Sequence, residues 1–92
     1  MVGYDLIPGY HLVVLDRVIS MYFPRIEDLR VDRDLRQKDV AEYLNMDPEV
    51  YRRYEKGIRE IPVWALIKLA KYYNTSTDYI LGLTNSKRPA KG

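Results

Sequence analysis

The sequence predicts an all-α fold of five helices between residues 24 and 84, preceded by an extra segment, residues 1–23. Apolar residues recur at three- and four-residue intervals in successive stretches after residue 24, as on the buried face of a helix. Proline, asparagine and glycine separate these stretches, and almost no strand pattern is found among them. With 92 residues, the chain has room for one small domain and none for a second core.

Each expected helix has its own start or stop signal. Pro24 suits a first turn, because a proline there leaves no helical hydrogen bond unmade. Residues 47–49 (Asp-Pro-Glu) offer an N-cap acceptor, a proline at the first position and an acid near the positive helix end. Asn45 and Gly57 can adopt the left-handed conformation that ends a helix, and Ser76 can cap the last one. The helices are expected to begin at Pro24, to span about 37–44 and 48–56, and to run from Pro62 to Tyr73 and from Ser76 to Gly82.

The stretch that begins at Pro62 is the most apolar and is expected to form the centre of the core. Its apolar positions are Val63, Leu66, Ile67, Leu69, Ala70 and Tyr73, and the last helix packs against it through Tyr79, Ile80 and Leu83. Several tyrosines lie on or beside apolar stripes, so we expect packing rather than base stacking of Tyr43, Tyr54, Tyr72, Tyr73 and Tyr79. Trp64 is expected in packing or in an interface.

Residues 1–23 fit two secondary structures. Leu12, Leu15, Ile19 and Phe23 fall on one face of a helix from Tyr10 to Phe23, and we take the helix as the prediction. The valine and isoleucine content of this run fits a strand almost as well. The expected organisation is thus an N-terminal extension at 1–23 that could serve in dimerisation, a helical domain at 24–84 and a basic, flexible tail at 85–92.

The composition argues against several classes of function. Cysteine is absent, which removes disulfides, thiolate metal sites and cysteine nucleophiles and fits a reducing cytoplasm. His11 is the single histidine, so neither a histidine metal centre nor a Ser-His-Asp triad is expected. No apolar run reaches the ~18 residues that span a bilayer. We therefore expect a cytoplasmic protein that is not an enzyme and has no cofactor, metal, membrane partner or small-molecule ligand.

Positive charge is concentrated in two places, although the net charge is only +2. One is a short segment in which Glu55 is the single acid among the bases Arg52, Arg53, Lys56 and Arg59. The other is the tail after residue 84, which contains Lys87, Arg88 and Lys91 and no acid. A phosphate backbone would respond to this asymmetry, whereas a solvated helix face and a soluble tail would show the same charges without a partner.

Two short helices are expected on either side of Asn45, Met46 and Asp47, and this arrangement is typical of a helix-turn-helix. In such a pair the first helix braces the second, which presents its N-terminal half to the major groove of DNA. Helical bundles of other function contain similar pairs, so this spacing alone does not establish DNA binding.

The residues themselves closely resemble a known family over 24–84. The matching stretches are LRQKDVAEYL at 35–44, YEKG at 54–57, REIP at 59–62, LIKLAKYY at 66–73 and STDYILGLT at 76–84. They resemble the lambda-repressor-like, or Cro/C1-type (XRE family), helix-turn-helix domain. This resemblance implies a compact five-helix bundle that binds double-stranded operator DNA, usually as a homodimer, and acts as a transcriptional regulator such as a repressor.

The resemblance also implies roles for individual residues. Gln37 matches a glutamine that contacts phosphate and braces the recognition helix, and Pro48, Glu49 and Arg53 occupy positions that face base edges. Arg53 could pair bidentately with guanine, and Pro48 could offer only an apolar contact. Glu49 could accept a hydrogen bond from cytosine, or it could hold Arg53 as its partner one helical turn away.

Four further basic residues are expected at phosphates: Lys38, Arg52, Lys56 and Arg59. Their alternative role is solvation of an exposed face. Arg30 and Glu55 match a pair that forms a partly buried salt bridge between the first and third helices, which is a structural role.

Three residues depart from the family pattern. Arg36 stands where a serine or threonine usually caps the second helix, so a cap worth ~0.5–2 kcal/mol is missing, although Arg36 could add a phosphate contact. Asn45 replaces a usual glycine. Tyr51 replaces a branched aliphatic residue, so the recognition helix could sit differently against the core.

Two functions from different classes remain open at this point. The first is a sequence-specific transcriptional regulator, dimerising through residues 76–84 or 1–23. The second is a protein-interaction module of the same fold, such as an antitoxin or a docking domain. DNA binding would weaken steeply with salt, and this dependence separates the two.

Overall fold

The computed structural model describes residues 11–15 and 18–89, and the expectations for residues 1–10, 16–17 and 90–92 lie outside it. The five predicted helices are confirmed, with their starts and ends close to the expected residues. The elements are β1 (His11–Leu15), β2 (Val18–Tyr22), α1 (Pro24–Asp32), α2 (Gln37–Tyr43), α3 (Pro48–Glu55), α4 (Val63–Tyr72) and α5 (Thr77–Ile80).

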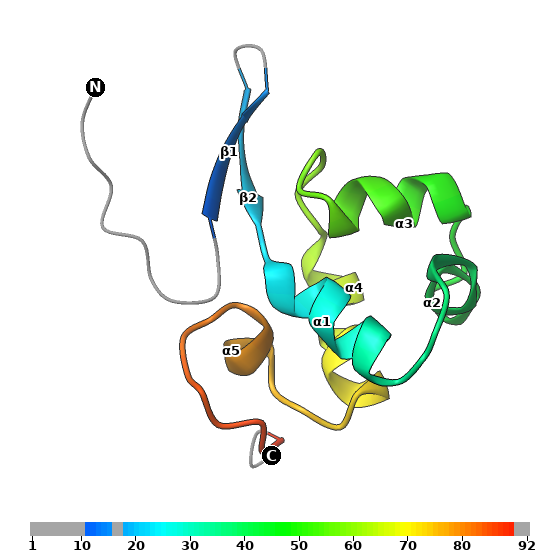
Figure 1. Ribbon diagram of the computed structural model, residues 1–92, viewed down its shortest axis with the longest axis vertical. Coiled ribbons are helices and arrows are strands. Elements are labelled where there is room, and N and C mark those ends of the chain that lie inside the picture. The colour runs from blue at the N-terminus through cyan, green and yellow to red at the C-terminus, as the bar shows by residue number, and fades with distance from the viewer. Residues whose placement is uncertain (1–10, 16–17, 90–92) are drawn as a thin grey trace.

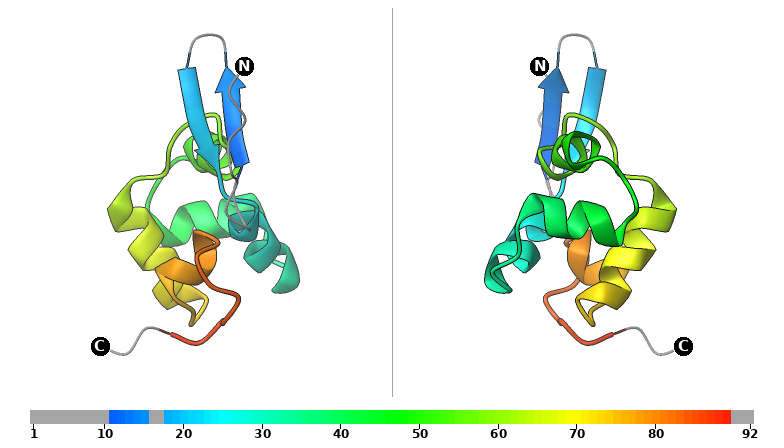
Figure 2. Two further views of the ribbon diagram at one scale, coloured as in Figure 1. Left: turned by 90° about the vertical axis from the view of Figure 1, so that its left-hand side faces the viewer. Right: turned by 90° about the vertical axis from the view of Figure 1, so that its right-hand side faces the viewer.

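Helix α1 lies at the middle of the helical bundle (Figure 1). It packs against α3 on one side and against α5 on the other, while α2 packs on α3 and α4 packs on α5. The short connection between α2 and α3 turns the two helices across each other, as in a helix-turn-helix (Figures 1 and 2).

The helix predicted for the run from Tyr10 to Phe23 is wrong, because the described part of this run forms two antiparallel strands. His11 pairs with Tyr22 and Leu15 with Val18 at the two ends of the register. The alternative, a strand, fitted the β-branched residues of the run, which lose rotamer freedom in a helix. The hairpin stands beside the loop that follows α3 (Figures 1 and 2).

The predicted signals at the helix ends are confirmed. Asp47 Oδ1 accepts a hydrogen bond from the Glu49 N–H at 2.8 Å, and Ser76 Oγ accepts one from the Tyr79 N–H at 2.9 Å. The left-handed conformation is found at Asn45 (φ 56°), Gly57 (φ 75°) and Gly82 (φ 81°), and also at Asp34 and Asn74. These local bonds and turns explain why each short helix starts and stops where it does.

The missing cap at Arg36 is partly replaced by a hydrogen bond in the opposite direction. An arginine side chain has no acceptor for the first N–H groups of α2. The Asp39 carboxylate, one turn later, accepts from the Arg36 backbone N–H at 2.8 Å and pairs with the Arg36 guanidinium at 3.3 Å. One half of a capping box is therefore present.

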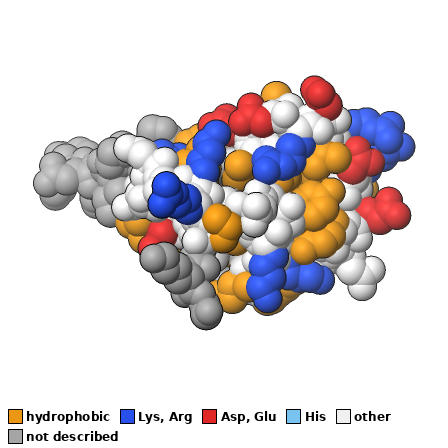
Figure 3. Space-filling view, turned by 90° about the horizontal axis from the view of Figure 1, so that it is seen from below, with side chains coloured by type: hydrophobic (Ala, Val, Ile, Leu, Met, Phe, Trp, Pro, Cys, Tyr) orange, Lys and Arg blue, Asp and Glu red, His pale blue; other side chains and the backbone are white. Residues whose placement is uncertain are grey.

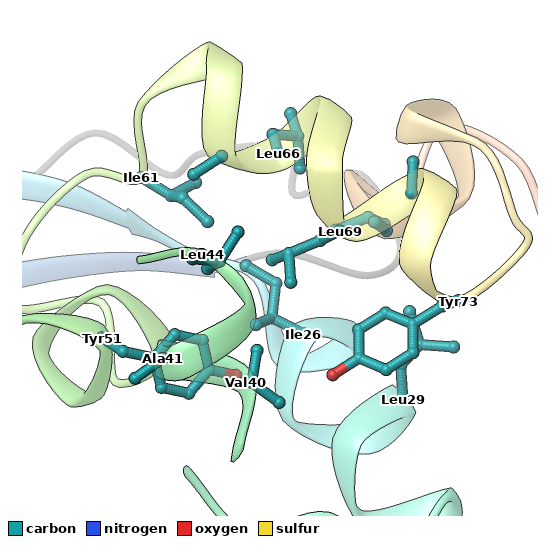
Figure 4. Packing of buried hydrophobic residues seen from close by; sticks show 13 residues of the cluster. Ile26, Leu29, Val40, Ala41, Leu44, Tyr51, Ile61, Leu66, Leu69 and Tyr73 are labelled. Atoms are coloured by element: carbon teal, nitrogen blue, oxygen red, sulfur yellow. The ribbon is translucent and has the colours of Figure 1, made fainter. Parts of the chain in front are cut away.

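The core is built from all five helices and the segments that join them. Its buried apolar residues are Ile26, Leu29, Val40, Ala41, Leu44, Tyr51, Ile61, Ala65, Leu66, Leu69, Ala70, Tyr73 and Ile80. Figure 4 shows Ile26 of α1 close to Leu44 and Leu69 at the centre of this cluster. The tyrosines expected to pack do so: Tyr73 is buried, and Tyr43, Tyr54, Tyr72 and Tyr79 pack against the cluster.

Three apolar residues expected in the core face solvent instead. Val63 is 70% exposed, Ile67 is 42% exposed and Leu83 is 54% exposed. Leu66 and Leu69 occupy the buried face of α4. The apolar residues of this helix cover a wider arc of its surface than the face that meets the core, so those at the edge of the arc are exposed. Trp64, next to Val63, is half exposed.

We expect Gly57→Asn to destabilise the protein by about 1–3 kcal/mol, because a new side chain would overpack this site. A Cβ at Gly57 would lie only 2.9 Å from the Tyr22 Cβ. Asparagine already adopts the left-handed conformation at Asn45 and Asn74, so the substitution isolates the steric conflict. Urea unfolding followed by circular dichroism measures the change. Asn45→Gly is the control, and an equal loss in both variants would contradict the explanation.

Candidate nucleic-acid interface

The N-terminal half of α3 lies open to solvent at the turn from α2. Asp47, Pro48 and Glu49 are exposed, whereas Tyr51, on the opposite side of the helix, is fully buried. The side chains of Arg52 and Arg53 are 40% and 41% exposed. Helix α3 therefore has a core-facing side and an arginine-bearing side, and the second is accessible in the described structure.

The core-facing side of α3 is fixed by the carboxylate of Glu55, which is completely buried. Arg30 of α1 donates to it twice, from Nε to Oε2 at 2.8 Å and from Nη2 to Oε1 at 3.2 Å. Gln37 of α2 donates to Oε1 at 3.0 Å, and the Tyr51 hydroxyl donates to Oε2 at 2.7 Å. One carboxylate thus connects three helices, and the pair expected from the family resemblance belongs to a larger cluster.

The protonation of this cluster follows from its hydrogen bonds. Burial disfavours the charged form of Glu55, but donation from Arg30, Tyr51 and Gln37 outweighs it and lowers the pKa of the carboxyl. The hydrogen bond between Arg30 and Glu55 also raises the pKa of Arg30. Burial, together with the hydrogen bond to Glu55, raises the pKa of Tyr51. Glu55 is therefore ionised at neutral pH, and its ion pair with Arg30 is intact.

Tyr51 sits in the core where the family usually has an aliphatic residue. Its ring is buried and its hydroxyl is satisfied by Glu55. A buried hydroxyl without a partner would be costly, so the larger side chain is accommodated by a hydrogen bond that an aliphatic residue could not make.

Glu49 forms salt bridges with two arginines of the exposed side of α3. Arg52 donates to it from Nε and Nη2, both at 2.8 Å, and Arg53 donates from Nε at 3.3 Å. The hydrogen bond from Arg52 is the main reason why the pKa of Glu49 falls to about 2, and Arg53 lowers it further. Glu49 therefore pairs with Arg53, which was one of the two roles expected for it. Its hydrogen bonds to Arg52 are shorter than the one to Arg53.

The remaining predicted contact residues differ in whether they are paired. Lys56, just after α3, forms a salt bridge of 3.1 Å with Glu27 of α1. Lys38 and Arg59 are exposed, and within residues 22–89 their side chains have no hydrogen bond or salt bridge. Lys38 and Pro48 line one shallow hollow between α2 and the start of α3.

We call the exposed residues of this region the α3 surface. It comprises Lys38, Pro48, Glu49, Arg52, Arg53, Lys56 and Arg59. Gln37 lies behind it, because its side-chain amide is engaged with Glu55.

The opposite side of the molecule has a different character. Figure 3 shows the face on the side of α5 and the C-terminal tail, where Lys and Arg side chains are interspersed with acidic and apolar ones. Arg25 there donates to the carbonyl oxygens of Tyr79 and Thr84 and to Asn85 Oδ1, at 2.8, 2.6 and 2.6 Å. This residue, which the sequence analysis did not single out, fastens the start of the basic tail to α1.

The described residues offer neither a metal site nor a membrane-spanning helix. They contain no group of three or more His, Cys, Asp or Glu side chains that could hold a metal ion. None of the helices in the described part is long and apolar enough to cross a membrane.

We expect Glu55→Ala to reduce the free energy of unfolding by about 3–5 kcal/mol, because it removes the acceptor of Gln37 and Tyr51 and leaves the partly buried Arg30 with only a longer salt bridge, 3.9 Å, to Glu27. Urea unfolding at neutral pH measures the loss. Glu49→Ala, on the exposed side of the same helix, is the matched control and should lose far less. Equal losses would show that the cluster around Glu55 does not hold α3.

We expect stability to fall as the pH drops below about 4.5, the region where an unfolded glutamate takes up its proton. The lowered pKa of Glu55 makes its contribution complete above that pH and lost as the pH falls through the folded value. Glu49 and Asp39, whose pKa values are also lowered, contribute in the same direction. Urea midpoints at pH 7, 4 and 3 test this, and the fall should be smaller in Glu55→Gln. An unchanged fall would assign the effect to the other carboxyls.

Comparison with known proteins places this geometry in a family. A family model described as Helix-turn-helix matches residues 26–80, more than half of the chain. The uncharacterized HTH-type transcriptional regulator YobD of Bacillus subtilis is 36% identical over 69 residues, which cover 75% of this chain and 62% of that protein. The cryptic phage CTXphi transcriptional repressor RstR of Vibrio cholerae is 42% identical over 53 residues, covering 58% and 48%.

A third relative is the HTH-type transcriptional regulator ImmR of Bacillus subtilis, 38% identical over 58 residues that cover 63% of this chain and 46% of that protein. The chain therefore spans about half to three fifths of the length of these relatives. No solved structure matches the chain with significance. Together with the crossed helices α2 and α3, the family match shows that the chain belongs to the helix-turn-helix family, in its lambda-repressor-like, Cro/C1-type form.

Proposed function

We propose that this protein is a sequence-specific transcriptional regulator that reads a short DNA operator through the major groove with α3. One observation supports this above the others. The helix is locked to the core on one side by Glu55, while its other side is exposed from Pro48 and Glu49 at its start to Arg53 near its end. A rigid helix whose accessible side carries a hydrogen-bond donor suits major-groove reading.

Arg53 is the proposed base-reading residue. Its Nε contacts Glu49, and no hydrogen bond within residues 22–89 engages its terminal nitrogens. A guanidinium of this kind can donate to guanine O6 and N7 together. Pro48 and Glu49, at the start of the same helix, are proposed to lie next to the base edges, Pro48 by apolar contact.

Phosphate contacts are proposed for the basic residues around α3. Lys38 and Arg59 are unpaired within the described structure and could bind phosphate directly. Arg52 and Lys56 are paired with Glu49 and Glu27, so they would exchange a carboxylate for a phosphate. Gln37 is proposed to brace α3 through Glu55 and to contact phosphate at the start of α2.

The direction of regulation is proposed from the relatives. RstR is named a transcriptional repressor, and YobD and ImmR are named transcriptional regulators. Occupancy of an operator by a small domain blocks access of other proteins to that DNA. We therefore propose repression, acting in the cytoplasm and without catalysis or a cofactor.

We further propose that the protein binds as a homodimer on a palindromic site, because one domain of this size contacts only a few base pairs. Two candidate surfaces are residues 76–84, where Leu83 is 54% exposed, and the segment 1–23, which contains the hairpin. Light scattering of the full chain and of a chain starting at Met21 distinguishes them, since only the second surface is lost in the shorter chain.

A protein-interaction module of the same fold is the second candidate. The observation in its favour is the exposed apolar side of α4, where Val63, Trp64 and, one turn later, Ile67 face solvent. Such side chains are typical of protein contacts. If this were the main function, affinity for duplex DNA would be weak and no sequence would be preferred.

We expect Arg53→Ala to relax the preference for duplexes selected from a random library at the base pair that it contacts, because it removes a bidentate contact worth ~1–3 kcal/mol. Arg59→Ala should instead weaken binding to all duplexes and reduce the slope of log affinity against log salt by about 1. Fluorescence anisotropy between 50 and 300 mM salt measures both. A failure to select any sequence, or binding that ignores salt, would contradict the proposed function.

A further inference from the structure

The α3 surface is occupied by the protein's own carboxylates. Of the basic residues proposed to bind DNA, Arg52 and Arg53 contact Glu49 and Lys56 contacts Glu27. A carboxylate and a phosphate offer a guanidinium the same kind of paired oxygens. DNA must therefore compete with Glu49 for the two arginines.

Glu49 treats its two arginines differently. It binds Arg52 through two parallel hydrogen bonds of 2.8 Å, which use both carboxylate oxygens and the fork of the guanidinium. It binds Arg53 through Nε alone at 3.3 Å. Arg52 is thus sequestered, whereas Arg53 is oriented along the helix with its terminal nitrogens available.

We infer that Glu49 is a specificity-determining residue that keeps Arg52 from the phosphates of non-specific DNA while aiming Arg53 at base edges. The inference rests on the proposed function and adds a role that is not a base contact. Specificity is a difference between affinities, so a group that weakens non-specific phosphate contacts more than it weakens the specific complex raises the preference for the correct bases. The negative charge of Glu49 also repels phosphates directly.

The carboxylate is suited to this role at physiological pH. Its low pKa, about 2, keeps it ionised, so protonation does not release Arg52. Glu49 and Arg52 are partly exposed, and ion pairs in such positions are weak. A DNA site that engages Arg53 and its neighbours can therefore displace the pair, whereas a single phosphate gains little by doing so.

The test is Glu49→Gln, which keeps the size of the side chain and removes its charge. Binding is measured to a duplex of mixed sequence and to the duplex that the wild type selects, between 50 and 300 mM salt. The variant should bind the mixed duplex about three- to tenfold more tightly, with a salt slope steeper by about 1–2, because released arginines reach phosphates. The preference for the selected duplex should fall by a similar factor.

Two further variants isolate the cause. Asp28→Asn removes one negative charge from an exposed position on α1 and reports the effect of net charge alone. Arg52→Ala combined with Glu49→Gln should lose about one unit of the added salt slope relative to Glu49→Gln, because the released arginine is absent. Circular dichroism confirms that each variant is folded.

The outcomes separate this inference from the proposed function. If Glu49→Gln changes mixed-duplex binding no more than Asp28→Asn does, the exclusion role is overturned while the regulator assignment stands. If it loses preference at one base pair with mixed-duplex binding unchanged, Glu49 reads a base directly, which also overturns the inference. If the wild type selects no sequence, the proposed function fails and the inference fails with it.

Discussion

The buried carboxylate of Glu55 is the constraint on which the rest of the structure depends. It collects donors from α1, α2 and its own helix, and it is fully desolvated. An unpaired charge in such a place would be strongly unfavourable. The three helices must therefore keep their relative positions, so that their donors reach the Glu55 carboxylate. This requirement fixes the angle at which α3 leaves the core, and with it the direction of every side chain on the opposite face.

The two sides of α3 show how one short helix serves both folding and recognition. On the inner side the ion pair of Glu55 is buried and its partners are held by packing. On the outer side Glu49 makes salt bridges of similar length that are partly exposed. Similar distances therefore have different consequences, because solvent screens the outer pairs and leaves them exchangeable.

Much of the fold could be predicted from the sequence, because its signals are local. Asp47, Asn45 and Gly57 set helix ends through contacts within a few residues. The exposure of Val63 and Ile67 could not be predicted. The apolar stripe of a helix identifies the side that packs, but which edge of the stripe is buried depends on how the neighbouring helices are placed. The strands at 11–15 and 18–22 were only the alternative to the predicted helix, because the same residues satisfy a helical spacing and a β-branched composition.

At the candidate site, the pairing of Arg30 with Glu55 was predicted only from the resemblance to a family. The hydrogen bond from Tyr51 to Glu55 was not predicted and is known only from the structure.

The close approach of Tyr22 to Gly57 has a mechanical consequence. Tyr22, at the end of β2, lies so close to Gly57 that a Cβ there would come within 2.9 Å of it, and Gly57 lies just after the end of α3. A displacement of β2 at this point would therefore also move the loop that follows the helix proposed to read DNA.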